Sequence, residues 1–147
     1  MRSRLIKTVL WSTCIVLVSM PPLFAQKGKP GGGGNTGGGS TACAAVTTPT
    51  LSTSSASPGT NVGVFGRVTN CSGGKKRYVV TISSMSSCGE ETVIASSVIT
   101  FNGGEAKLIS VQYPINPNTC HGPMMVSTSV YSGGTMIATD SASLMVQ

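Results

Sequence analysis

A regular succession of short β-type runs constrains the fold of this chain more than any other feature. From Cys43 onward Ser, Thr and Val dominate, and turn residues interrupt them about every 8 to 15 positions. No window shows the 3.6-residue period of an amphipathic helix, whereas several runs alternate apolar and polar residues as half-buried strands do. Many short strands with evenly spaced turns are typical of an all-β sandwich or barrel.

Seven strands are expected from these runs. Two of the breaks, at 102–104 and 132–134, contain paired glycines and predict tight hairpin turns. Proline residues fall in loops or near strand ends, where a missing backbone donor does no harm. The expected strands are about 46–54, 61–70, 77–85, 91–101, 105–113, 124–131 and 135–146.

Residues 1–25 predict a secretory signal peptide. Arg2, Arg4 and Lys7 precede a mainly apolar run over 8–18, and the small residue Ala25 follows. A membrane anchor is the alternative, but this run is shorter than the roughly 20 residues that span a bilayer. We therefore expect cleavage after Ala25.

Residues 26–42 predict a flexible linker, and residues 43–147 a single domain. The linker is rich in glycine, which has no side chain to bury and much backbone entropy to lose. After cleavage, seven lysine and arginine residues face four acids, a net charge of +3. A charge of this size favours solubility and gives no reason to expect a nucleic-acid partner.

Four cysteines remain after cleavage, namely Cys43, Cys71, Cys88 and Cys120. An even number in an exported chain predicts two disulfides in an oxidising compartment, so the protein is expected to be secreted, periplasmic or at the cell surface. Zinc is the alternative, but the cysteines include no Cys-x-x-Cys pair of the kind that sets ligand geometry.

The strand pattern resembles an immunoglobulin-like or fibronectin type III-like sandwich. The valine-alternating run over 61–72 leads into Asn70, Cys71 and Ser72, and it is similar to the second strand of bacterial cell-adhesion-related domains. These domains carry an Asn-x-Gly or Asn-x-Ser turn at that point. The chain departs from antibody-type domains, because Trp11, its one tryptophan, lies in the signal peptide.

The resemblance also implies how the cysteines pair. In such a sandwich the first and second strands are antiparallel neighbours, and so are the third and sixth. Cys43 would then lie beside Cys71 at one end, and Cys88 beside Cys120 at the other. Each disulfide closes a loop of about 30 residues, worth about 3 to 4 kcal/mol in the chain-entropy account.

Residues suited to catalysis are few, and we expect neither enzyme activity nor a cofactor. A Ser-His-Asp triad would need His121, Asp140 and one of many serines, but there is no Gly-x-Ser-x-Gly motif. Glu90 and Glu91 would face opposite sides of a strand. No Gly-Lys-Ser or Gly-Lys-Thr phosphate-binding motif occurs.

Copper is a weaker alternative. Cys120, His121, Met124 and Met125 are residue types that bind copper in blue-copper sites. The chain has only one histidine, however, and Cys120 is needed for a disulfide. We therefore predict no metal site.

A possible binding loop contains Lys75, Lys76 and Arg77, because the loops at the ends of such sandwiches often bind partners. The alternative is a solvated turn that discourages edge aggregation. Asn70 also begins a glycosylation sequon, Asn-Cys-Ser.

The sequence thus predicts a non-catalytic secreted or surface module that binds or scaffolds. Its partner would be an unknown protein or cell-surface polymer, and the domain would be a monomer without a stable membrane span after cleavage. The first alternative is a subunit of a surface or adhesive assembly that pairs through an edge strand. The second is a copper-binding or hydrolytic protein.

Overall fold

The computed structural model describes residues 16–19 and 41–147, and these residues form strands and loops without a helix. Eight strands lie within 41–147, so the expectation of seven is wrong. The first expected run ends early, at Leu51, and a separate two-residue strand follows it. The strands are β1 (Val16–Ser19), β2 (Ala44–Leu51), β3 (Ser55–Ala56), β4 (Asn61–Asn70), β5 (Lys76–Met85), β6 (Glu91–Phe101), β7 (Ala106–Pro114), β8 (Gly122–Ser132) and β9 (Thr135–Val146).

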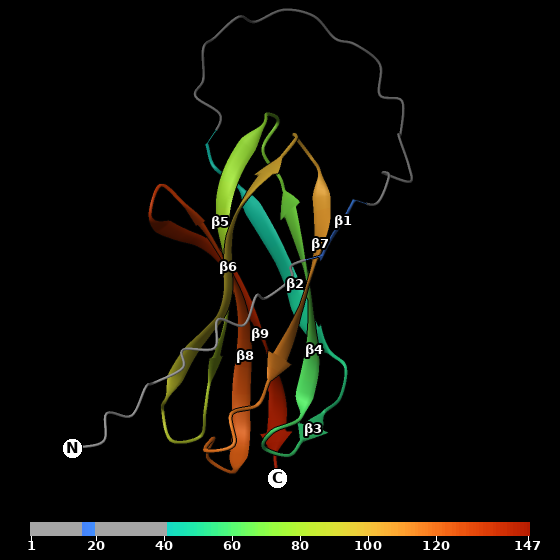
Figure 1. Cartoon of the computed structure of the whole chain (residues 1–147). Coiled ribbons are helices and arrows are strands. Elements are labelled where there is room, and N and C mark those ends of the chain that lie inside the picture. The colour runs from blue at the N-terminus through green and yellow to red at the C-terminus, as the bar shows by residue number, and fades with distance from the viewer. Residues whose placement is uncertain (1–15, 20–40) are drawn as a thin grey trace, which may run out of the picture.

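The strands form two sheets that pack face to face, as an immunoglobulin-like sandwich does (Figure 1). One sheet has the order β1-β7-β4-β2, and the other has the order β3-β9-β8-β5-β6. Strand β3 runs parallel to β9, so the chain crosses from the first sheet to the second between Leu51 and Ser55. This crossing explains the extra strand, since one straight run could not belong to both sheets.

The two glycine turns have different roles. Gly133 and Gly134 have φ values of 57° and 84° and join β8 to β9, which pair as a hairpin. The turn at 102–104 also contains a glycine with positive φ, Gly104 at 71°. It leads from β6 in one sheet to β7 in the other, so the hairpin expected there is wrong.

The core lies between the sheets and is built from alternate residues of each strand. Val62, Val64 and Val68 of β4 are completely buried, as the alternation predicts. Tyr78 and Phe101 from the opposite sheet pack with ring centroids 5.7 Å apart. All of these side chains belong to one continuous cluster of buried apolar residues.

A disulfide lies at each end of the sandwich. The structure joins Cys43 to Cys71 and Cys88 to Cys120, the same two pairs that the sequence predicts. Cys43 precedes β2 and Cys71 follows β4, and these strands are antiparallel neighbours. Cys88 follows β5 and Cys120 precedes β8, which also pair antiparallel.

The predicted signal peptide and linker fall mainly outside the described residues, which omit 1–15 and 20–40. Four residues of the predicted signal peptide form β1 and pair with β7. In the part of the chain that the structure describes, no helix is long and apolar enough to cross a membrane.

Candidate binding site on the open side of the sandwich

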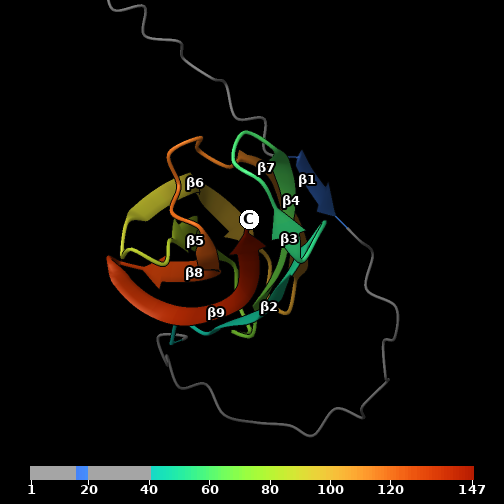
Figure 2. The same ribbon diagram turned by 90° about the horizontal axis from the view of Figure 1, so that it is seen from below.

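The two long sides of the sandwich differ. On one side β2 and β9 lie close together, and the Thr48 hydroxyl donates a hydrogen bond to Asp140 Oδ2 at 2.8 Å. Strand β3 closes the end of this side by pairing with β9. On the other side one sheet ends at β6, and in the other sheet the short strand β1 is the only described strand beyond β7. Few residues of β6 and β7 meet (Figure 2). This second side is called the open side below.

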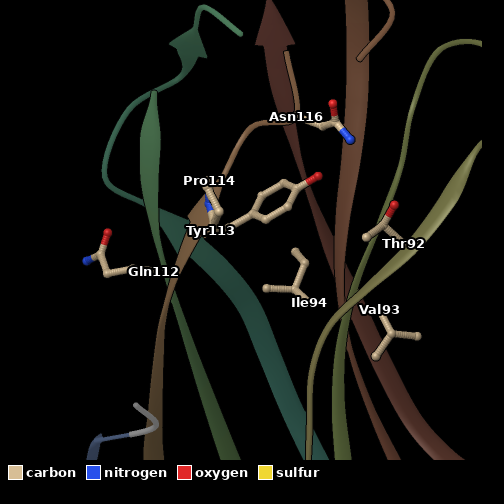
Figure 3. Close-up of a pocket in the computed structure, with 7 residues that line it drawn as sticks. All are labelled: Thr92, Val93, Ile94, Gln112, Tyr113, Pro114 and Asn116. Carbon is tan, nitrogen blue, oxygen red and sulfur yellow. The ribbon is translucent and has the colours of Figure 1, made fainter. Parts of the chain in front are cut away.

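A pocket of about 270 Å³ lies on the open side between β6 and β7. The Tyr113 ring points from β7 toward β6, where Thr92 and Ile94 lie (Figure 3). The Tyr113 hydroxyl is held in place by a hydrogen bond that it accepts from Ser84 Oγ at 3.2 Å. The full lining is Thr92, Val93, Ile94, Gln112, Tyr113, Pro114 and Asn116.

The chemistry of this pocket suits one uncharged group. None of its lining residues carries a charge. Its volume is below the roughly 300 to 1,000 Å³ of pockets that hold cofactors and drug-sized ligands. Among the residues that the structure describes, no three His, Cys, Asp or Glu side chains gather to hold a metal ion. The pocket thus presents apolar, hydroxyl and amide groups to solvent.

The backbone of β7 presents an uninterrupted row of hydrogen-bonding groups on the open side. The amide of Asn70 donates to Glu105 O at 2.9 Å, and the amide of Ile115 donates to Thr60 O at 2.9 Å. Between these bonds β4 and β7 pair over nine consecutive positions without a shift. In an antiparallel ladder alternate residues face the partner strand, so the odd-numbered residues of β7 face β4. The even-numbered ones turn their N–H and C=O groups outward.

Four residues of β7 thus offer both groups at the outward edge: Ala106, Leu108, Ser110 and Gln112. The next outward position is Pro114, which has no N–H to leave unpaired, and its place agrees with the rule that proline sits on the solvent side of edge strands. The outward edge of β7 therefore ends at a proline, and each outward position before the proline has both an N–H and a C=O group.

Strand β1 occupies part of this edge. It runs antiparallel to β7, with Val16 opposite Ser110 and Ser19 opposite Lys107 (Figure 1). The outward groups of Leu108 and Ser110 face Val18 and Val16 in this register. The outward groups of Gln112 lie beyond it.

The neighbouring edge, on β6, is interrupted. Its register with β5 shifts between Ile82 and Ser83, whose partners are Ala95 and Val93. Ile94 is left without a partner, which makes a β-bulge. Bulges twist an edge and discourage strand pairing, so β7 is the better acceptor of the two.

Lys107 secures one end of the open side. Its ammonium donates to the carbonyl of Thr100 at 2.8 Å and lies 3.6 Å from Glu105 Oε1. It also lies 5.5 Å from the centre of the Phe101 ring. These contacts link β7 to β6. The positive charge of Lys107 therefore interacts with groups of the domain itself.

The three residues of the predicted basic loop do not all lie in the loop or point to the same face. Lys75 is exposed in the turn, Lys76 begins β5 and is half-buried, and Arg77 is exposed. Successive strand residues point to opposite faces, so Lys76 and Arg77 are turned away from each other. The prediction started this strand one residue later and placed all three charges in the turn.

The residues considered for catalysis or copper binding are also separated. Asp140 lies opposite Thr128, whereas His121 comes just before Gly122, which lies opposite Val146. Six strand residues, or about 20 Å, separate these two levels of β9. Cys120 is bonded to Cys88, so its sulfur is no thiolate ligand.

Asn70 has a structural environment that the sequence reading missed. Its side chain is completely buried, and Nδ2 donates to the carbonyls of Gly74 and Asn102, both at 2.8 Å. Its Oδ1 accepts from the amide and hydroxyl of Ser72 and from the Tyr78 hydroxyl. Both Nδ2 hydrogens are used, so the folded domain offers no position for a glycan here. Asn70 shares strand parity with Val62, Val64 and Val68, and that parity could have predicted its burial.

The outer face of the β9-β8-β5-β6 sheet holds an apolar set that was also missed. Met85 lies directly opposite Met125, and both side chains are about half exposed. Hydroxyl pairs such as Ser127 with Ser141, at 2.9 Å, occupy the middle of this face. The exposed large apolar residues are Val79, Met85, Val93, Val98, Met125, Met136 and Met145.

Comparison with known proteins identifies the fold and no family. No family model matches the chain, and no curated protein sequence does. The CARDB domain of a Pyrococcus furiosus protein, solved in complex with di-metal ions, is similar in structure, with a TM-score of 0.54 at 12% identity over 74% of this chain and 89% of that one. Its length is close to that of the present domain.

Two larger proteins contain a similar domain. The alkylpurine DNA glycosylase AlkC of Pseudomonas fluorescens gives a TM-score of 0.60 at 13% identity, over 71% of this chain and 30% of that one. A β-glucosidase of Erythrobacter marinus gives 0.59 at 10% identity, over 72% of this chain and 16% of that one. The chain spans less than a third of either protein. At these identities the similarity concerns the fold alone, which is consistent with an all-β, immunoglobulin-like sandwich, and it does not extend to the activities of those proteins.

Proposed function

We propose that this chain is an exported, non-catalytic module that binds a partner protein through the open side of its sandwich. The observation that carries the proposal is the regular outward edge of β7, which accepts β1 over Lys107–Ser110 and lies beside an uncharged pocket. Edge strands with unpaired backbone groups recruit extended peptides, and nearby pockets select among them. The two disulfides support export, because such bonds persist in oxidising compartments.

Two further observations agree with a binding role. The sequence resemblance to bacterial cell-adhesion-related domains rests on the run that ends at Asn70. The uncharged lining of the pocket favours recognition of a neutral group over acid–base chemistry.

The second candidate function is a subunit of a surface assembly that pairs through its edge strand. The pairing of β1 with β7 favours it, since a strand is accommodated at that edge without a shift in the β4–β7 register. The two functions share one site and differ in whether the bound strand comes from a separate ligand or from the next subunit.

Export and chemistry can be tested on the protein as it is made. The full chain is expressed in a bacterial host, and the exported product is analysed by intact mass under non-reducing conditions. We expect cleavage after Ala25 and no free thiol. Labelling by a fluorophosphonate, or stoichiometric copper after dialysis, would contradict a non-catalytic role, and retention of the uncleaved chain in the cytosol would contradict export.

A further inference from the structure

We infer that the outward edge of β7 is a strand-accepting site for an extended apolar segment of a partner protein. The segment would pair antiparallel with Lys107–Ser110, in the register that Val16–Ser19 adopts here. The inference rests on the proposed function, because Val16–Ser19 belong to the signal peptide that we propose is removed. Cleavage after Ala25 takes this strand away and leaves the edge open.

The number of backbone groups sets the minimum length of the ligand. Leu108 and Ser110 each present one N–H and one C=O outward, and a partner residue opposite each can exchange two hydrogen bonds with it. A segment of four residues therefore forms up to four hydrogen bonds, as an added strand does in β-augmentation. Extending it toward Gln112 would add two more.

The side chains next to the site are mainly apolar. On the outer face, half-buried Phe65 lies opposite Ser110, and Arg67 lies opposite half-buried Leu108. On the inner face, buried Ile109 and Val111 belong to the core. An added strand would extend both faces, so residues with high β propensity and apolar side chains fit it best. The Lys107 ammonium is held by Thr100 and Glu105, and the exposed side chain of Arg67 is the charge on the outer face.

The pocket gives the site a means of selection. An antiparallel ligand that continues past Ser110 places its next residues opposite Val111, Gln112 and then Tyr113. Tyr113 points inward and lines the pocket. The ligand residue opposite Tyr113 would lie on the same side of the sheet, at the mouth of this uncharged pocket. We therefore expect that residue to be uncharged, and four positions before the one that lies opposite Ile109.

Amide hydrogen exchange on the uncleaved chain tests the site directly. Val18→Pro removes an N–H that bonds the outward edge of β7, without altering the residues of the domain. We expect the amides of Leu108 and Ser110 to exchange at least about tenfold faster in this variant than in the parent chain. The amides of Ile109 and Val111, which bond β4, should remain slow in both.

A peptide of residues 15–20, added to the Val18→Pro chain, then supplies the strand in trans. We expect it to slow exchange at Leu108 and Ser110 again, whereas the same peptide carrying the proline should not. Ser110→Pro in the domain should abolish this effect, because proline is tolerated at an outward position but lacks the donor. Ser110→Ala is its matched control and should retain the effect. If Ser110→Pro fails to fold, the proline peptide still decides the question.

Three outcomes would overturn the inference: equal exchange at Leu108 and Ser110 in the parent and Val18→Pro chains, no slowing by the peptide, or protection of both amides by self-association seen in sedimentation. None of these outcomes bears on export or on disulfide formation. A chain that is cleaved and exported but ignores the peptide would therefore retain the proposed export, and it would lose the strand site, leaving the pocket as the remaining ground for binding.

Discussion

Replacement of Asn70 by alanine tests the reading of this residue as a buried structural centre. The Asn70 amide group makes five hydrogen bonds at the end of β4, next to the Cys43–Cys71 disulfide. Alanine removes all of them, but every bonding partner except the Ser72 amide keeps another contact. The Tyr78 hydroxyl still donates to Cys43 O at 2.9 Å, and the Ser72 hydroxyl still donates to Gly74 O at 3.0 Å.

The Ser72 amide, in a buried residue, loses its partner and has no substitute nearby, whereas the Asn102 carbonyl keeps the hydrogen bond that it accepts from the Glu105 amide at 3.2 Å. An unsatisfied buried polar group costs about 1 to 3 kcal/mol. We therefore expect Asn70→Ala to lower the free energy of unfolding by about 1 to 3 kcal/mol. For a domain whose total stability is about 5 to 15 kcal/mol, this loss is large.

Urea unfolding followed by circular dichroism, with both disulfides intact, measures the loss. Asn61→Ala is the matched control, because Asn61 lies at the exposed start of the same strand, and its effect should stay within about 0.5 kcal/mol. A difference between the two variants of less than about 1 kcal/mol would refute the account of Asn70. So would a glycan on Asn70 of the folded protein made in a glycosylating host.

Three further predictions concern side chains inside and outside the core. The Thr128 hydroxyl is buried and has no hydrogen-bond partner among the described residues, so Thr128→Val should raise the free energy of unfolding by about 1 kcal/mol in urea titration. A Cβ on Gly66 would lie 2.9 Å from Thr128 Oγ1, so Gly66→Ala should cost about 1 to 3 kcal/mol, and adding Thr128→Ala should recover part of this loss. Dilute peroxide should oxidise Met125 and Met145, which are 54% and 46% exposed, well before Met124, which is 1% exposed, as peptide mass spectrometry can show.

Much of the fold followed from local patterns. The alternation in the 61–70 run placed Val62, Val64 and Val68 inside, where the structure has them. The β8–β9 hairpin followed from the glycines at 133 and 134. The glycines at 103 and 104 led to a wrong prediction of a hairpin. Glycines with positive φ determine the shape of a turn, but they do not determine which sheet the next strand joins.

The candidate site could not be predicted in the same way. Alternation separates the inner from the outer side chains, but it does not say which strand lies at a sheet edge or which of its amides point outward. The position of β7 at the sheet edge and the direction of its amides depend on the pairing of β7 with β4. The paired residues of these strands are about 45 positions apart in the sequence. The basic residues at 75–77 were conspicuous in the sequence, yet the start of β5 at Lys76 turns two of them to opposite faces. The site is formed by the backbone of β7, and Pro114 is the one residue of this strand whose type indicates an edge position.

The edge strands of this sandwich are protected against strand pairing to different degrees. This difference supports a strand-binding function. An exposed, regular edge invites aggregation, and proteins shield such edges with bulges, prolines or covering segments. Here β6 has a bulge at Ile94, and β2 lies against β9 through Thr48 and Asp140. Strand β7 has a proline only at its last residue, and its remaining cover is β1, which export would remove. An edge left open in the exported form, beside an uncharged pocket, is what a strand-binding module needs, whereas a purely structural domain would gain stability and solubility by blocking it.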